Sequence, residues 1–123
     1  MRAKSLEIIK LADNPSIGKG LYSILYNLAF SPKIKYIDCS NCIVDSAETG
    51  EALYKLISIS GAIETLNLSK TNVFAYLTEQ FWKAVGESKT LQYLNLDSNS
   101  RPTAQTAFLG KAIAMNAYKN GSL

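Results

Sequence analysis

A nine-residue pattern occurs four times in this chain at nearly constant spacing, and it limits the fold more than any other feature. The fourth copy, Leu91-Gln-Tyr-Leu-Asn-Leu-Asp-Ser-Asn99, has leucine at its first, fourth and sixth positions and asparagine at its ninth. The copies cover residues 6–14, 34–42, 63–71 and 91–99, so they begin 28, 29 and 28 residues apart. Such a period indicates stacked units that share one continuous core.

Each copy is predicted to form a short strand followed by a turn. Positions four and six point to the same side of a strand, because side chains alternate along it, and we expect them to be buried against the next unit. Position nine lies where the strand ends, and a polar side chain there can hydrogen bond to the buried backbone of the turn. This position holds Asn14, Cys42, Thr71 and Asn99.

Between the copies, the spacing of apolar residues changes from alternating to helical. Four helices are predicted, with apolar faces at Leu21, Ile24, Leu25 and Leu28; at Leu53, Leu56 and Ile57; at Phe81, Ala84 and Val85; and at Leu109, Ala112 and Ile113. Gly50 is expected to precede the second helix, Thr78 to cap the third and Gly86 to end it. The predicted fold is α/β, a right-handed solenoid with the parallel sheet inside and the helices outside, in one domain over residues 1–123.

The repeats resemble the ribonuclease-inhibitor-like class of leucine-rich repeats over essentially the whole chain. The resemblance rests on the strand motif, on the alternating lengths and on the Asn-x-x-x-Gly-x-Gly turn from Asn14 to Gly20. It implies a horseshoe-shaped segment that binds other proteins. Nuclease inhibitors, activators of the Ran GTPase, the tropomodulins of the actin pointed end and innate-immune receptors share this class.

Both ends of the sequence resemble interrupted repeats. Asn120-Gly-Ser-Leu123 is similar to Ser88-Lys-Thr-Leu91, so Leu123 would open a fifth copy. Solenoids need polar capping units, and neither end shows one. We therefore expect a fragment of a longer solenoid or, alternatively, a protein that self-associates through its open ends.

Composition excludes several classes of function. The net charge is only +3, and lysine and arginine are scattered, which argues against a nucleic-acid partner. No apolar run is long enough to cross a bilayer, so no membrane partner is expected. The chain has no histidine and no nucleophile–base pair, so we expect neither an enzyme nor a cofactor. Two cysteines without a secretory signal predict a cytoplasmic protein.

Three local features could indicate catalytic or ligand-binding chemistry, but their places in the repeat explain them better. Cys39 and Cys42 form a C-x-x-C pair, but they occupy repeat positions six and nine, and a zinc site would need two further ligands. Gly18-Lys19-Gly20 holds only part of a phosphate-binding loop. Asp38 and Asp97 should lie roughly 10 Å apart without a partner base. We expect packing for the cysteines and a solvated surface for the carboxylates.

The aromatic residues after the third strand are predicted to pack. Trp82 should lie on the flank of the third helix and contact a neighbouring helix, with an exposed anchor as the alternative. Phe74 and Tyr76 should fill the edge of the core.

The predicted function depends on positions three, five and seven, which project from the inner face of the sheet. Position three holds Ile8, Tyr36, Thr65 and Tyr93; position five holds Lys10, Asp38, Asn67 and Asn95; position seven holds Ala12, Ser40, Ser69 and Asp97. Aromatic anchors among adaptable polar groups are typical of protein-binding surfaces. We expect a non-enzymatic protein-interaction module. The alternative is a regulatory solenoid segment, either actin-binding of the tropomodulin type or GTPase-activating of the Ran activator type.

Overall fold

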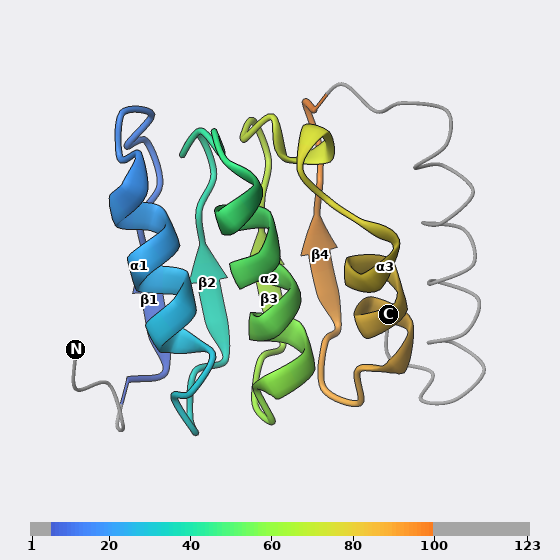
Figure 1. Cartoon of the computed structure of the whole chain (residues 1–123). Coiled ribbons are helices and arrows are strands. Elements are labelled where there is room, and N and C mark those ends of the chain that lie inside the picture. Colours follow the sequence, from blue (N-terminus) through green and yellow to red (C-terminus); the bar gives the residue numbers. More distant parts are fainter. Residues whose placement is uncertain (1–5, 100–123) are drawn as a thin grey trace.

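The computed structural model describes residues 6–99, over which strands and helices alternate (Figure 1). The elements are β1 Ile8–Lys10, α1 Lys19–Leu28, β2 Tyr36–Asp38, α2 Ala47–Ile59, β3 Thr65–Asn67, the 3-10 helix η1 Val73–Ala75, α3 Glu79–Glu87 and β4 Tyr93–Asn95. The predicted α/β alternation is confirmed for four strands and three helices. The predicted helix over Leu109–Ile113 and the fifth copy at Leu123 lie outside the described residues.

The four strands form one parallel sheet in the order β1-β2-β3-β4. Equivalent repeat positions are paired, so the fourth positions Ile9, Ile37, Leu66 and Leu94 lie in one row. Hydrogen bonding continues beyond the three-residue strands into the turns. The eighth-position amide of one repeat donates to the seventh-position carbonyl of the next, as from Lys70 to Asp97 (3.1 Å). Each turn is therefore held by its neighbour.

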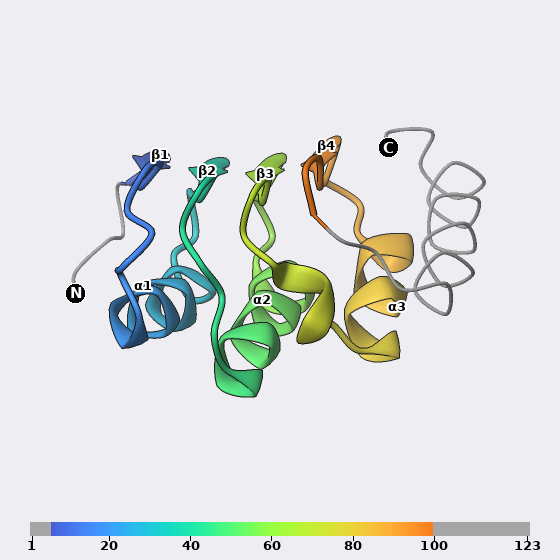
Figure 2. The same cartoon turned by 90° about the horizontal axis from the view of Figure 1, so that it is seen from above.

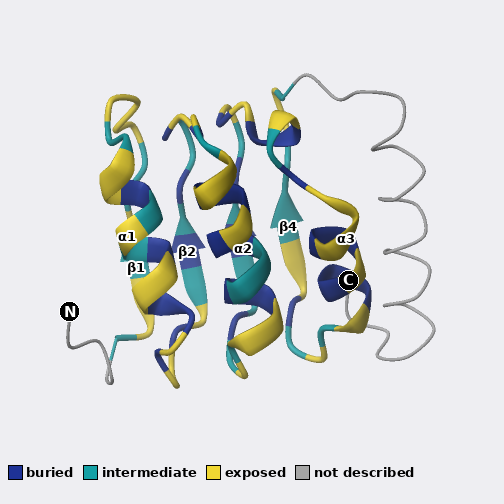
Figure 3. Ribbon diagram, viewed as in Figure 1, coloured by how far each residue is buried: buried dark blue, intermediate teal, exposed yellow. Residues whose placement is uncertain are grey.

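The structure has two layers, with the strands on one side and the helices on the other (Figure 2). Helix α1 packs against α2, and α2 packs against α3. Buried and exposed residues alternate along each helix, as expected for helices with one face on the core (Figure 3). The core between the layers includes Leu25, Leu53, Leu56, Phe81 and Val85. None of the described elements covers the face of the sheet that points away from the helices (Figure 2). No helix within residues 6–99 is long and apolar enough to span a membrane.

Burial of the repeat positions depends on having a neighbour on both sides. Positions one, four and six of the middle repeats are fully buried, whereas Leu6, Ile9 and Leu11 of the first repeat are only partly buried. Trp82 is buried, 2% exposed, as expected for packing rather than for an exposed anchor, and its ring stacks on that of Phe74 in η1 with 6.0 Å between the ring centroids. The expected places of Phe74 and Tyr76 at the edge of the core are also confirmed.

The predicted helix boundaries need corrections at Gly50 and Gly86. Helix α2 begins at Ala47, so Gly50 lies inside it, and Ser46 is the cap, accepting a hydrogen bond from the Thr49 amide (3.3 Å). A Cβ on Gly50 would collide with the backbone carbonyl of Tyr76, and this contact explains the glycine. Thr78 is the N-cap residue of α3, as predicted, although its side chain makes no capping hydrogen bond. Gly86 is a buried residue within α3 rather than its end.

The eighth position of every repeat adopts left-handed backbone conformation. The φ angles are 65° at Asp13, 55° at Asn41, 55° at Lys70 and 60° at Ser98. A side chain with a Cβ is disfavoured there, asparagine and aspartate least so. Lys70 and Ser98 are therefore less suited to this conformation than Asp13 and Asn41.

We expect Lys70→Gly to raise the free energy of unfolding by about 0.5–1 kcal/mol, because glycine relieves the left-handed strain. Urea denaturation measures the change. Lys89 is the matched control, since it is also exposed but does not have positive φ. Lys89→Gly should lower stability, because glycine only adds freedom to the unfolded chain. Equal losses for both variants would contradict the assignment of strain to the turn.

Candidate functional site

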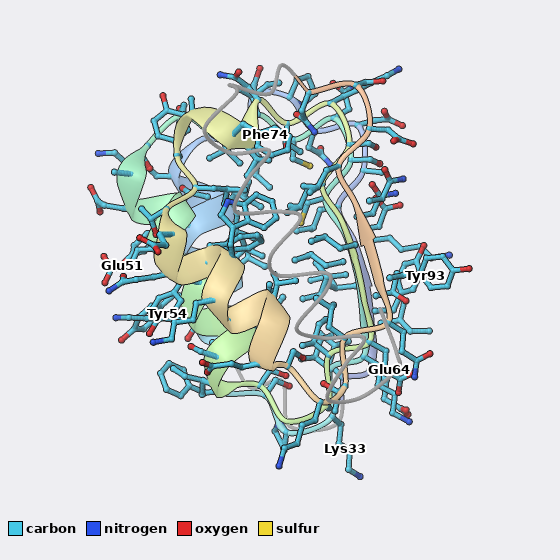
Figure 4. All side chains as sticks on the ribbon, turned by 90° about the vertical axis from the view of Figure 1, so that its right-hand side faces the viewer. Lys33, Glu51, Tyr54, Glu64, Phe74 and Tyr93 are labelled. Carbon is cyan, nitrogen blue, oxygen red and sulfur yellow. The ribbon has the colours of Figure 1, made fainter. Side chains whose placement is uncertain are left out.

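Eight of the nine residues predicted to bind a partner lie in the strands, on a side of the sheet that the described helices leave uncovered, and Asp97 lies just beyond β4. Pairing places position three of all repeats in one row and position five in the next. Along β2 and β3 these residues are half-buried, while the fourth-position residue between them is buried. Figure 4 shows the two sides, with Tyr93 and Glu64 at the sheet and Glu51 and Tyr54 among the helices. The nine are Ile8, Lys10, Tyr36, Asp38, Thr65, Asn67, Tyr93, Asn95 and Asp97.

The position-three row forms an aromatic surface with a shorter residue within it. Tyr93 is 71% exposed and Ile8 is 56% exposed, whereas Tyr36 and Thr65 are half-buried. Thr65 pairs with Tyr36 on one side and Tyr93 on the other. Two tyrosines therefore flank a smaller side chain in this row.

The position-five row has a structural role that the sequence interpretation missed. Oδ1 of Asp38 accepts a hydrogen bond from the Ser40 amide (3.0 Å), and Asn67 and Asn95 make the same bond two residues ahead. Such bonds are typical of Asx turns, and the recurring Asp/Asn-x-Ser/Asp spacing could have revealed them. One oxygen of each side chain is thus occupied and its orientation fixed.

The rest of each position-five side chain is free to meet a partner. Among residues 6–99, the Nδ2 groups of Asn67 and Asn95 and the second carboxylate oxygen of Asp38 have no hydrogen-bond partner. Because Oδ1 is bound to the backbone, the asparagines offer donors and the aspartate offers an acceptor. The row therefore presents a defined sequence of chemical groups.

Position nine supports the scaffold, as predicted. Nδ2 of Asn99 donates to the carbonyls of Leu68 (2.8 Å) and Leu96 (3.0 Å), and its Oδ1 accepts from the amides of Thr71 (2.9 Å) and Asn72 (2.8 Å). Cys42 Sγ donates to the carbonyl of Leu11 in the preceding repeat, whereas the side chains of Thr71 and Asn14 donate to carbonyls of their own repeats. The side-chain bonds of Asn99 and Cys42 therefore join neighbouring repeats.

The cysteine pair is part of the core. Both thiols are free and fully buried. Burial raises the pKa of Cys39 to about 12, with smaller contributions from the nearby charges of Cys42 and Asp38. Burial also raises the pKa of Cys42. Buried neutral thiols are poor nucleophiles and poor ligands, and residues 6–99 contain no group of acidic or cysteine side chains that could hold a metal.

The helix side has a row of aromatic residues that was not predicted, in which Tyr26 and Phe30 are exposed and Tyr22 is partly buried. The rings of Tyr22, Tyr26 and Phe30 follow one another at 6.0 Å and 5.5 Å, and Lys55 Nζ lies 5.6 Å from the centre of the Tyr26 ring. Their spacing of four residues, from Tyr22 and Tyr26 on α1 to Phe30 just after it, was the available signal. Between α2 and α3 there is an open groove of about 400 Å³ whose lining includes Tyr54. The sheet side differs in that its aromatic and polar groups lie in register across four strands.

Comparison with known proteins finds a shared fold. No family model matches the sequence. The C-terminal domain of tropomodulin from Caenorhabditis elegans superposes with a TM-score of 0.55 and 14% identity, over 94% of this chain and 87% of that one. Leiomodin-1 Actin-Binding Site 2 superposes with a TM-score of 0.59 and 16% identity, over 94% of this chain and 83% of that one. The chain thus has the leucine-rich-repeat-like α/β fold of these domains.

Proposed function

We propose that this chain is a non-enzymatic protein-interaction module that binds a protein partner through its sheet face. In this proposal the sheet is the concave side of a right-handed solenoid of the ribonuclease-inhibitor-like class. One observation supports it most strongly: tyrosine, asparagine and aspartate side chains lie in register on a face that none of the described elements covers. Rigid aromatic residues bordered by oriented polar groups form effective protein-binding surfaces.

Two features of the side chains favour a binding role over catalysis. The sequence lacks histidine, and the thiols of Cys39 and Cys42 are buried with raised pKa values. We propose no cofactor. We also propose that residues 1–123 form one domain that works in the cytoplasm, where a reducing environment keeps both thiols free.

We expect Tyr36→Ala and Tyr93→Ala each to weaken partner binding by about 1–3 kcal/mol, because each removes an aromatic anchor from the sheet face. Titration calorimetry with the purified partner measures the change. The free energy of unfolding should hardly change in Tyr93→Ala, since Tyr93 is 71% exposed. Phe30→Ala is the matched control, because Phe30 is 59% exposed but follows α1 in the helix layer. Unchanged affinity in both tyrosine variants would refute binding through this face.

A second candidate function is actin binding. It is favoured by the likeness to a leiomodin-1 domain that is itself named an actin-binding site. Cosedimentation with filaments and a pull-down of monomeric actin would test it. Binding that Tyr93→Ala weakens and Phe30→Ala does not would make actin the partner at the sheet face. No observation favours the GTPase-activating alternative.

A further inference from the structure

The sheet face carries opposite charges on neighbouring strands. In the position-five row, Lys10 on β1 is paired in register with Asp38 on β2, and the neutral Asn67 and Asn95 follow. No ion pair joins Lys10 to Asp38; the ion pairs within residues 6–99 are Lys35–Glu7 and Lys55–Glu51. The row therefore offers a partner one cation, one carboxylate and two amide donors in a fixed order.

The spacing of this row fits the repeat of an α-helix. Neighbouring strands lie about 4.8 Å apart, and one helical turn rises about 5.4 Å. A helix lying across the strands would present one turn to each of them, and the mismatch over four strands is only roughly 2 Å. An extended strand fits less well, because side chains on one of its faces recur at about 7 Å.

The surroundings of Asp38 favour arginine as its partner. Tyr36 lies two residues earlier on β2, so its side chain projects to the same side of the sheet. The turn already binds Oδ1 of Asp38, which orients the other oxygen. A planar guanidinium can stack on an aromatic ring and pair with a carboxylate at the same time.

We infer that the sheet face binds an α-helix of the partner that lies across the strands, with an acidic residue opposite Lys10 and an arginine one turn later opposite Asp38 and against Tyr36. Hydrogen-bond acceptors on the next two turns meet the amides of Asn67 and Asn95. This inference rests on the proposed function and specifies the chemistry of the partner at that same face.

A double-mutant cycle with synthetic peptides tests the inference. The probe is a stapled helical peptide of alanine and glutamine with Glu-x-x-x-Arg on one face, and the comparison peptides replace the arginine or the glutamate by glutamine. Asp38→Asn is a conservative variant, because Asn67 and Asn95 make the same turn bond at the equivalent position. The full chain of 123 residues is used.

We expect Asp38→Asn to weaken binding of the Glu-x-x-x-Arg peptide about tenfold and to leave the peptide without arginine unchanged. Lys10→Gln should weaken binding about threefold, only when the glutamate is present. Both effects should shrink as salt is added. Glu51→Gln and Lys55→Gln alter the ion pair on the helix side and should change nothing.

The outcomes separate the two proposals. Equal losses for peptides with and without arginine, or no binding of the peptide by the unmodified chain, would overturn the inference. If Tyr36→Ala still weakens binding of the protein partner, the sheet face binds a partner of other chemistry and the proposed function stands. If Tyr36→Ala and Tyr93→Ala leave that affinity unchanged, both proposals fail.

Discussion

Replacing Asn99 by alanine is expected to lower the free energy of unfolding by about 3 kcal/mol. The Asn99 side chain donates to the carbonyls of Leu68 and Leu96 and accepts from the amides of Thr71 and Asn72. Its removal leaves several backbone groups of two neighbouring repeats without a partner, and each costs about 1–3 kcal/mol where water cannot replace it. Urea denaturation followed by circular dichroism measures the change.

Asn14→Ala is the control for this experiment. Asn14 occupies the same repeat position, but it is exposed and bonds only to the carbonyls of Leu11 and Ala12 in its own repeat. Water can replace these bonds, so the loss should be about 1 kcal/mol or less. Losses of equal size at the two positions would show that the position-nine side chain does not connect the repeats.

Replacing Gly50 by alanine should lower the free energy of unfolding by about 2–3 kcal/mol, although alanine favours helices by about 1 kcal/mol over glycine. A Cβ at this point of α2 would overlap the carbonyl oxygen of Tyr76 and lie 3.1 Å from its carbonyl carbon. Backbone atoms cannot rotate away as a flexible side chain can, so the segment from η1 to α3 must shift. Thermal or urea denaturation measures the loss.

Gly61→Ala provides the matched comparison. A Cβ on Gly61 would meet no atom within 4 Å, and its backbone is not left-handed. Alanine should be neutral there or raise stability slightly by restricting the unfolded chain. If Gly50→Ala changed the free energy of unfolding as little as Gly61→Ala, that result would contradict the close approach of the Tyr76 carbonyl to α2.

The repeat made the sheet predictable from the sequence. Side chains alternate within each strand, and the copies recur at a nearly constant interval. Together these two periods predict the row of fourth-position residues from Ile9 to Leu94. The role of position nine followed from the need to satisfy the turn backbone. Burial of Cys39 and Cys42 followed from their repeat positions.

Features set by contacts between repeats were harder to predict. Gly50 was placed before α2, because the carbonyl that requires a glycine comes from Tyr76 in the next repeat and leaves no local signal. Thr78 has a suitable residue type and position, yet its side chain makes no capping hydrogen bond. Local patterns describe each repeat, whereas these details depend on how its neighbours approach.

The sequence predicted which residues lie in the candidate site but not which of their atoms are available to a partner. The rows containing Tyr36, Thr65 and Tyr93 follow from strand alternation alone. The turn bonds of Asp38 and Asn67 were missed, and these bonds decide which of their atoms can meet a partner. Scaffold residues such as Leu66 would be the same for any partner, so the partner's identity has to come from the side chains between them.

Site-specific photocrosslinking is the most direct test of binding through the sheet face. Benzoylphenylalanine replaces either Tyr93, 71% exposed at the sheet, or Phe30, 59% exposed after α1, and each chain is irradiated with actin or another purified partner. We predict an adduct from position 93 that unlabelled chain competes away and a Tyr36→Ala competitor does not, with none from position 30. A competed adduct from position 30 and none from position 93 would place binding on the helices and contradict the proposed function.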